Sequence, residues 1–305
     1  MNKTGQFSAI LVVLALSAFL CHTLYAMSST NYYINWDSIN IGGTDFSSST
    51  NFYMHDTLGE MSTGRSSSTN YWIYAGYRQP EEVEDYLQFS LSAQKNSTKI
   101  SYTAFSDSSK QVTLSDASGY SIGDYIAVIE DMGANQLVAI GKITNISGNL
   151  LTVDKWDGNN GSMGAPAGGD DFVYKLEGND INLGYLSSDN VNTGVVRIEV
   201  NTSASSGYTT EFAEDGNLRY GSTEITDVSD GYITFGSEEY GVETVGATAS
   251  GTGDFAIRSD AQIVQTSSAP AENDRIGIIH KISIDSSTGA GPLSHVVSFY
   301  VTANF

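Results

Sequence analysis

The stretch LVAIGKITNISGNLLTVDKW, residues 137–156, decides the fold class. Two runs rich in Val, Ile and Leu flank the turn residues Ser147, Gly148 and Asn149. Short apolar runs bounded by Gly, Asn and Ser are typical of β-strands that are joined by tight turns. The stretch therefore predicts two adjacent strands.

The same pattern recurs along most of the chain. Further runs of this kind are IAVIED (126–131), VVRIEV (195–200), GYITFG (231–236) and HVVSFYV (295–301). The sequence holds 31 glycines and only 4 prolines, and it has no long run with a period of 3.6 residues. We therefore expect an all-β protein of antiparallel sheets, in which the acidic segment PEEVED (80–85) is a linker.

The N-terminus has the order of a secretory signal peptide. Lys3 precedes an apolar run over residues 7–20, and the small residue Ala26 follows at the expected cleavage position. The alternative, an uncleaved membrane anchor, would need an apolar run of roughly 20 residues. We expect residues 1–26 to be removed and the protein to be secreted and held at the cell surface, with no transmembrane segment in the mature chain. Cys21, the only cysteine, would be removed with the signal, so the mature chain would fold without disulfides.

The charge of the chain narrows the choice of partners. Removal of Lys3 would leave 13 basic against 35 acidic residues, a net charge of −22. Nucleic-acid binding depends on Lys and Arg contacts to phosphate, so a nucleic-acid partner is not expected.

Residues 27–79 contain an internal repeat. SSTNYYI (28–34) recurs as SSTNFYM (48–54) and as SSTNYWI (67–73), at offsets of 20 and 19 residues. Each unit leads from a Ser/Thr/Asn turn into an aromatic strand, and a unit this short cannot bury its apolar face alone. The repeat predicts a three-unit β arm that stacks on neighbours or on another surface.

Aromatic side chains crowd this arm. Successive residues of a strand face opposite sides, so one ring of each adjacent pair would point outward. Outward rings on a sheet suit subunit contacts or sugar stacking; the alternative is that both faces are covered within the monomer. The candidate binding face consists of Tyr33, Trp36, Tyr53, Trp72 and Tyr74.

Residues 110–177 have a different character. They contain the turn GYSIGD (119–124), the hairpin ITNISGNLLTV (143–153) and the closing run DFVY (171–174). With these motifs the segment resembles the small SH3-like barrels of secreted and phage structural proteins. The resemblance implies a fold and no function.

Residues 178–305 hold INLGYL (181–186), VVRIEVNT (195–202) and the terminal run FYVTANF (299–305). They resemble the β-sandwich of bacterial surface proteins of the WxL-like or pilin-like type, although the WxL tripeptide is missing. In such sandwiches a strand precedes the LG-x-L segment, and residues 86–103 fit that place. The expected organisation is signal peptide 1–26, β repeat arm 27–79, acidic linker 80–85, first part of an antiparallel β-sandwich 86–103, inserted SH3-like barrel 104–177 and remainder of the sandwich 178–305.

A calcium loop is the one metal site that the sequence suggests. The mature chain would have no cysteine and only three histidines, at the unrelated positions 55, 280 and 295, so a zinc or copper site is not expected. Oxygen ligands on a glycine-rich loop suit calcium, but their spacing is not that of an EF-hand, and the alternative is a solvated acidic hairpin. The candidate ligands are Asp154, Asp157, Asn159, Asp170 and Asp171. No other cofactor is expected.

One motif points to catalysis. Residues 119–123 spell G-x-S-x-G around Ser121, which in hydrolases is a nucleophile between a strand and a helix. The run that follows predicts a strand, so a turn that enters a strand is the preferred interpretation. We expect no enzyme but an extracellular structural protein, a self-associating filament or surface-layer subunit; the alternatives are a glycan-binding adhesin or carbohydrate-binding module, and then a hydrolase.

Overall fold

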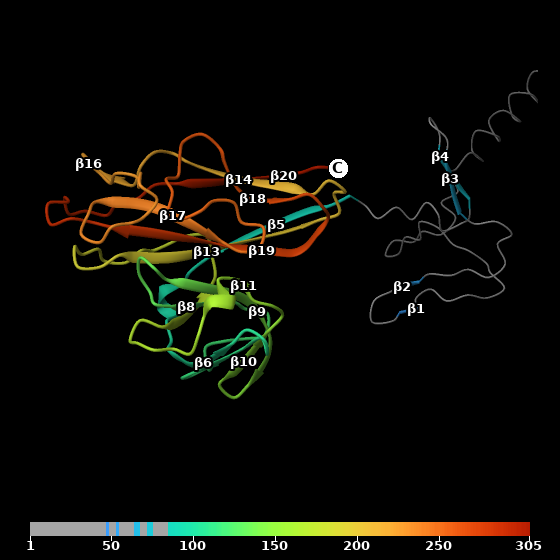
Figure 1. Ribbon diagram of the computed structural model, residues 1–305, viewed down its shortest axis with the longest axis horizontal. Helices are drawn as coiled ribbons and strands as arrows, with labels where there is room; N and C mark the ends of the chain where they lie inside the picture. The colour runs from blue at the N-terminus through green and yellow to red at the C-terminus, as the bar shows by residue number, and fades with distance from the viewer. Residues whose placement is uncertain (1–46, 49–52, 55–63, 68–71, 76–84) are drawn as a thin grey trace, which may run out of the picture. The chain divides into compact units, whose positions relative to one another are not determined.

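The structure, a computed structural model, describes residues 85–305 and, of the N-terminal part, residues 47–48, 53–54, 64–67 and 72–75 (Figure 1). The chain divides into two compact units, Met1–Glu82 and Val83–Phe305. The expected signal peptide lies outside the described residues. The prediction of an all-β protein made of antiparallel sheets is confirmed for the described chain.

The N-terminal unit contains two antiparallel hairpins. In the first, β1 (Ser47–Ser48) pairs with β2 (Tyr53–Met54); in the second, β3 (Gly64–Ser67) pairs with β4 (Trp72–Ala75). Both β2 and β4 begin at aromatic positions of the repeat.

Two sheets of the second unit face each other. The four-stranded sheet has the order β17-β19-β13-β5 and the three-stranded sheet the order β18-β14-β20. Ile198, Val242 and Ile276 of the first sheet share one core cluster with Phe212 and Val264 of the second. The strands are β5 (Leu87–Ala93), β13 (Asn192–Thr202), β14 (Tyr208–Glu214), β17 (Glu239–Val245), β18 (Gln262–Ser267), β19 (Ala271–Ser283) and β20 (Val297–Ala303), with a small hairpin of β15 (Arg219–Tyr220) and β16 (Thr223–Glu224).

The burial of each strand follows from what covers its two faces. β14 alternates buried and half-buried residues, because one face packs on the core and the other meets solvent. β13 is buried almost throughout, since Ile198 faces the core between the two sheets while Val195 packs against a third sheet. Each such apolar side chain, fully buried, contributes about 1.5–3 kcal/mol.

The third sheet, here called the curled sheet, lies against the four-stranded sheet (Figure 1). Its order is β12-β8-β9-β10-β7-β6, with β11 on β9, and it bends because β9 pairs with β8 through one half and with β10 through the other. Paired hydrogen bonds between Ile100 and Val173 bring the first and last segments of this path together. Its elements are β6 (Tyr102–Ser106), β7 (Gln111–Leu114), β8 (Tyr125–Glu130), β9 (Leu137–Ser147), β10 (Leu150–Val153), β11 (Asp157–Gly158), β12 (Phe172–Leu176) and the 3-10 turns η1 (Asn96–Thr98) and η2 (Asn160–Ser162).

The two strands predicted from residues 137–156 are β9 and β10. Ser147 pairs with Leu150, so Gly148 and Asn149 form the turn between them. Gly148 has a φ of +60°, a conformation that a side chain disfavours, which explains why glycine occupies this position.

The curled sheet interrupts the four-stranded sheet in sequence. β5 and β13 are neighbours in that sheet, yet the whole curled sheet lies between them in the chain. Residues 86–103 divide between the sheets: β5 pairs with β13, whereas Ile100 and Tyr102 pair within the curled sheet. Tyr102 and Ile100 belong to the core of the curled sheet, so its strands begin before residue 104.

A second apolar cluster joins the curled sheet to the four-stranded sheet. Ile140 and Tyr174 from one side pack with Val195, Val245 and Ile279 from the other. The approach is close at Gly277, where a Cβ atom would lie 2.9 Å from Ile140 Cδ1 and 3.0 Å from Val245 Cγ2. Glycine therefore permits this packing.

Candidate functional site

The predicted aromatic face is described in part. Tyr33 and Trp36 lie outside the described residues. Tyr53 lies in β2, and Trp72 and Tyr74 lie in β4, where they stand opposite Ser67 and Arg65 of β3. The binding face itself stays a prediction.

The acidic residues predicted to hold calcium separate into three groups. Asp154 and Asp157 meet Arg275 of β19, whose side chain is fully buried. Asn159 accepts a hydrogen bond from the backbone N–H of Val138 at 3.2 Å. Asp170 and Asp171 lie together in the third group, beside Asp131.

Arg275 is the centre of a buried ion network between the curled sheet and the four-stranded sheet. Its Nε lies 2.7 Å from Glu199 Oε2 and 3.6 Å from Asp157 Oδ2, and its Nη2 donates to Asp154. Burial alone would raise the pKa of Asp154, but the hydrogen bonds from Arg275 and from the Lys142 backbone hold it below its usual range. The protein supplies its own cation here, so this part of the loop serves structure.

A ring stacks on the same network. The guanidinium of Arg197 lies 3.7 Å from the centroid of the Tyr125 ring, and the Tyr125 hydroxyl donates to Glu199 Oε1 at 3.0 Å. Arg197 also donates to Ser92 Oγ and Ser90 Oγ on β5. The network thus fixes β5, β13 and β19 to the curled sheet.

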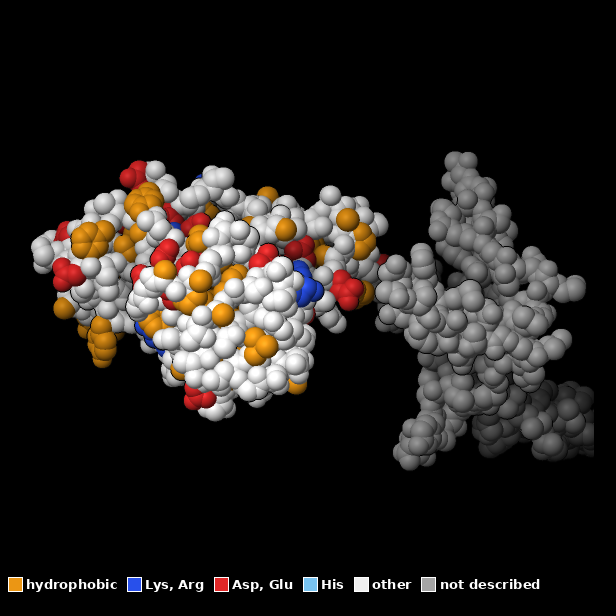
Figure 2. Space-filling model, turned by 60° about the horizontal axis from the view of Figure 1, so that its bottom comes forward, with side chains coloured by type: hydrophobic (Ala, Val, Ile, Leu, Met, Phe, Trp, Pro, Cys, Tyr) orange, Lys and Arg blue, Asp and Glu red, His pale blue; other side chains and the backbone are white. Residues whose placement is uncertain are grey.

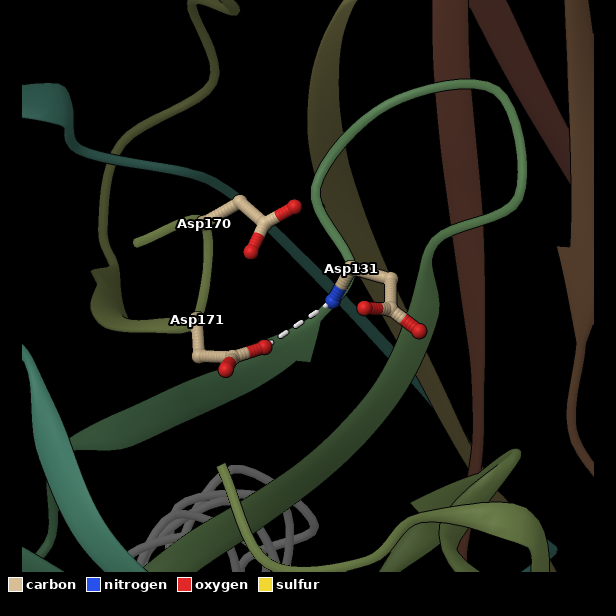
Figure 3. Close-up of side chains that lie close together, drawn as sticks. All are labelled: Asp131, Asp170 and Asp171. Atoms are coloured by element: carbon tan, nitrogen blue, oxygen red, sulfur yellow. Dashed lines mark hydrogen bonds between the residues drawn. The ribbon is translucent and has the colours of Figure 1, made fainter. Parts of the chain in front are cut away.

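Asp170 and Asp171 form an acidic cluster with Asp131, which the sequence did not single out (Figure 3). One carboxylate oxygen from each lies within 4.8 Å of the others. Asp171 is buried and accepts two backbone hydrogen bonds, from Asp131 N–H at 3.0 Å and from Ala167 N–H at 2.8 Å. Asp131 and Asp170 are exposed.

Two histidines, His280 and His295, lie in a buried chain of hydrogen-bonded polar side chains. The Tyr240 hydroxyl is 2.7 Å from His280 Nδ1 and 3.0 Å from His295 Nε2, and His295 Nδ1 is 3.0 Å from Glu214 Oε2. Burial lowers the pKa of His280 to about 3 and raises the pKa of Glu214 to about 7. With His280 neutral, every contact is satisfied if His280 Nδ1 donates to Tyr240, Tyr240 to His295 and His295 to Glu214. Because the four residues come from both facing sheets, the chain ties the sheets together.

Ser121 has the surroundings of a turn residue. Its backbone N–H donates to Asp124 Oδ2 at 2.8 Å, and Gly123 adopts a φ of +97°. β8 follows directly, where a nucleophile elbow needs a helix. His280 and His295 are engaged in the buried chain described above.

The clearest open surface is the side of the unit where β5 and β20 run. The outer edge of β17 is bridged by Asp227 and Phe255, and that of β18 by Ala249. β5 and β20 end their sheets, and neither has a second strand partner among the described residues. Phe89 of β5 and Phe299 of β20 have ring centroids 6.5 Å apart, so the two edges lie on the same side; we call this side the open edge.

The backbone of the open edge has unused hydrogen-bonding groups. Ala93 turns its N–H and C=O away from β13 and bonds Gly178 and Glu177. By the alternation of an antiparallel strand, Leu87, Phe89 and Leu91 turn theirs to the same outer side, where the described chain offers no backbone partner. A row of unpaired N–H and C=O groups is a template for an added strand.

Apolar side chains accompany this edge. Leu87 is 37% exposed and Phe89 is 38% exposed, although both share a strand face with the fully buried Ala93. Tyr86, Tyr300 and Phe305 are also exposed nearby along β5 and β20. Elsewhere, apolar side chains reach the surface in small groups between polar atoms, as Figure 2 shows for one face.

No protein-family model, no curated protein and no solved structure matches this chain. Among the described residues, no helix has the length and hydropathy to cross a membrane.

Proposed function

We propose that the protein is an exported structural subunit that assembles by strand addition at the open edge. The observation that carries the proposal is the free edge of β5, with outward backbone groups at Leu87, Phe89 and Leu91 and apolar side chains that remain over one-third exposed at Leu87 and Phe89. An uncovered strand edge with apolar side chains can pair without specificity unless a dedicated strand covers it.

The proposed occupant is an aromatic repeat strand from a second copy of the chain. The repeats at 28–34, 48–54 and 67–73 are predicted from the sequence to form aromatic strands. β5 starts at Leu87, five residues after Glu82, where the N-terminal unit ends. β3 and β4 have four residues each, close to the five residues of the free stretch of β5 from Leu87 to Leu91. Strand addition uses backbone bonds for affinity and side-chain pockets for selectivity.

The proposed architecture follows the expected organisation. The two facing sheets are a β-sandwich of the WxL-like or pilin-like kind, and the curled sheet is an SH3-like barrel inserted between β5 and β13. The support is the shared core of the two sheets and the chain path from β5 through the curled sheet to β13. We propose that the chain passes from the four-stranded sheet into the curled sheet at Gln94, which forms an isolated β-bridge with Leu176.

The first test compares two chains, one from Met27 and one from Glu81, by light scattering and negative-stain microscopy. Polymers formed by the longer chain only, with the shorter chain monomeric, are the expected result. Two monodisperse monomers would refute self-assembly.

An edge variant makes the test specific. Leu87→Pro in the longer chain removes an outward N–H at the start of β5 without removing a bond to β13. We expect loss of polymers with the fold retained in circular dichroism. The control is Ile263→Pro on β18, an exposed apolar strand position that lies away from the open edge and should leave polymers intact.

A further inference from the structure

A second property lies at one end of the curled sheet, around the acidic cluster. β8 ends at Glu130 and β12 begins at Phe172, and the two strands pair antiparallel with Ile129 opposite Phe172. The residues just past these strand ends, Asp131 and Asp170–Asp171, therefore meet at the same edge, where Met132 N–H bonds the Asp170 carbonyl at 3.2 Å. The cluster is fixed by strand register as well as by loop conformation.

A buried tyrosine lies next to this cluster on a third segment of the curled sheet. Ile100 pairs with Val173 through two hydrogen bonds, in a bridge that does not extend to Tyr102 and Asp171. Tyr102 packs in the same core cluster as Val173, and the alternation of residues along the chain puts Asp171 on the same face as Val173. Tyr102 is only 4% exposed, and its hydroxyl is buried with no hydrogen-bond partner among the described residues. Burial raises the pKa of Tyr102, and the charges of Asp171, Glu130 and Asp131 raise it further, in that order.

An unsatisfied buried hydroxyl costs about 1–3 kcal/mol, so the buried Tyr102 hydroxyl calls for a partner. A hydrated cation supplies one, because a water on the ion accepts the phenol proton while the carboxylates bind the ion. Oxygens on opposite sides of a calcium ion lie about 5 Å apart, given bonds of about 2.3–2.6 Å, and the three Asp oxygens lie within 4.8 Å of one another.

The neighbouring loop is built to keep this arrangement. Glu130 accepts the backbone N–H of Gly164 at 2.8 Å, and Asp171 accepts that of Ala167 at 2.8 Å. Both bonds hold the loop between η2 and β12 over the strand ends. Asp131 has a φ of +55°, which Asp tolerates better than most residues and which turns the chain into the cluster.

We propose that Asp131, Asp170 and Asp171, with the Tyr102 hydroxyl in the outer sphere, bind a hard divalent cation of the calcium class. Three carboxylates, one already bonded to two backbone N–H groups, correspond to the weak range of extracellular calcium sites, on the order of 10⁻⁴–10⁻³ M. The site is separate from the open edge, and its failure would leave the assembly proposal untouched.

Calorimetric titration of the full chain with Ca²⁺ tests this site. Asp131→Asn with Asp170→Asn removes two charged ligands from exposed positions, and Asn tolerates the backbone at 131. The matched control is Asp180→Asn with Asp189→Asn, which makes the same charge change at two exposed aspartates outside the cluster. We expect at least a tenfold loss of Ca²⁺ affinity in the first variant and less than a twofold change in the control. Equal affinity in the two variants, or no binding by the wild-type chain up to about ten times the expected dissociation constant, would overturn the proposal.

Terbium luminescence locates the ion independently of affinity. Tb³⁺ takes oxygen ligands like those of Ca²⁺, and its emission is sensitised by a nearby tyrosine. Tyr102→Phe should remove most of the sensitised emission that Ca²⁺ competes away, while Tyr185→Phe, at a fully exposed position, should not change it. Unchanged emission in Tyr102→Phe would contradict the placement of the ion beside this hydroxyl.

Discussion

Arg275 gives the sharpest test of how the curled sheet is held to the rest of the unit. Its side chain is fully buried and serves three carboxylates, those of Asp154, Asp157 and Glu199. Arg275→Met keeps most of the side-chain volume but removes the charge. Among the described residues, the carboxylates would then keep two cationic partners, Arg197 at 3.5 Å from Glu199 and the half-exposed Lys155 at 2.8 Å from Asp157, which compensate only in part.

Removal of one partner from a buried ion pair costs about 3–5 kcal/mol, because the remaining charge is buried without a counter-ion. We expect Arg275→Met to lose about this much stability at neutral pH, which for a unit of this size lowers Tm by roughly 10 °C. The loss should shrink as pH falls through the carboxyl range, since the stranded carboxylates, with pKa values raised in the variant, become neutral by protonation.

The assay is urea denaturation of the chain that starts at Glu81. Trp156 is then the only tryptophan. It is buried in the curled sheet, and its ring centroid lies 5.2 Å from that of Phe105. Its fluorescence reports whether the curled sheet unfolds. Arg258→Met is the control, because its pair with Asp260 is exposed and contributes about 0–1 kcal/mol. A loss below about 1 kcal/mol for Arg275→Met would refute the argument that this arginine anchors the junction.

Three further outcomes follow from the structure. Gly277→Val should destabilise by about 1–3 kcal/mol in the same assay, because its Cβ would meet Ile140 and Val245 at 2.9–3.0 Å; a neutral result would contradict the close packing at the junction. The folded pKa of His280, about 3, lies below its ordinary 6.5, so the folded state loses stability as pH falls below 6.5 and the unfolded chain takes up a proton. The pKa of Glu214 is raised to about 7, so its contribution to stability is lost as pH rises from 4.5 to 7. His280→Gln should therefore flatten the loss of stability between pH 6 and pH 4 by up to about 1.4 kcal/mol per pH unit relative to wild type, measured by urea midpoints, and parallel curves would count against a buried neutral histidine. Assembly of the chain from Met27 should increase with added salt in light scattering, because screening weakens repulsion between copies of net charge −22, and salt-induced dissociation would point instead to ion pairs at the contact.

The strands could be predicted from the sequence because their signal is local. Alternation in residues 137–156 and turn chemistry at Gly148 are written in adjacent residues, and both appear as expected. The closing run from Val297 likewise becomes β20. Local signals do not specify which strand pairs with which, so the contribution of residues 86–103 to two sheets had to come from the structure.

The Arg275 network and the acidic cluster depend on which strands pair, so most of their residues could not be predicted from the sequence. Arg275 reaches Asp154 across 121 residues, and nothing near either residue in sequence indicates the contact. Asp131 joins Asp170 and Asp171 only because β8 pairs with β12 in one register. A signal was present in the two runs themselves, since one ends in Glu130-Asp131 and the other begins after Asp170-Asp171, which antiparallel pairing brings together. Nothing in the sequence around Tyr240 indicates that its hydroxyl links two histidines.

Intermolecular disulfide capture tests the central claim, that the repeat strands of one copy cover the open edge of another. Cys21 is the only cysteine, so a chain from Met27 is free of thiols. Trp72→Cys in one batch is mixed with Leu87→Cys in a second batch, under mild oxidation, and disulfide-linked pairs are counted by gel and peptide mass. The control replaces the second batch with Tyr185→Cys, at a fully exposed position outside the open edge. We expect many more linked pairs with Leu87→Cys than with Tyr185→Cys. Equal yields, or no linked pairs with Leu87→Cys in chains that still polymerise, would show that the repeat strands do not cover the open edge.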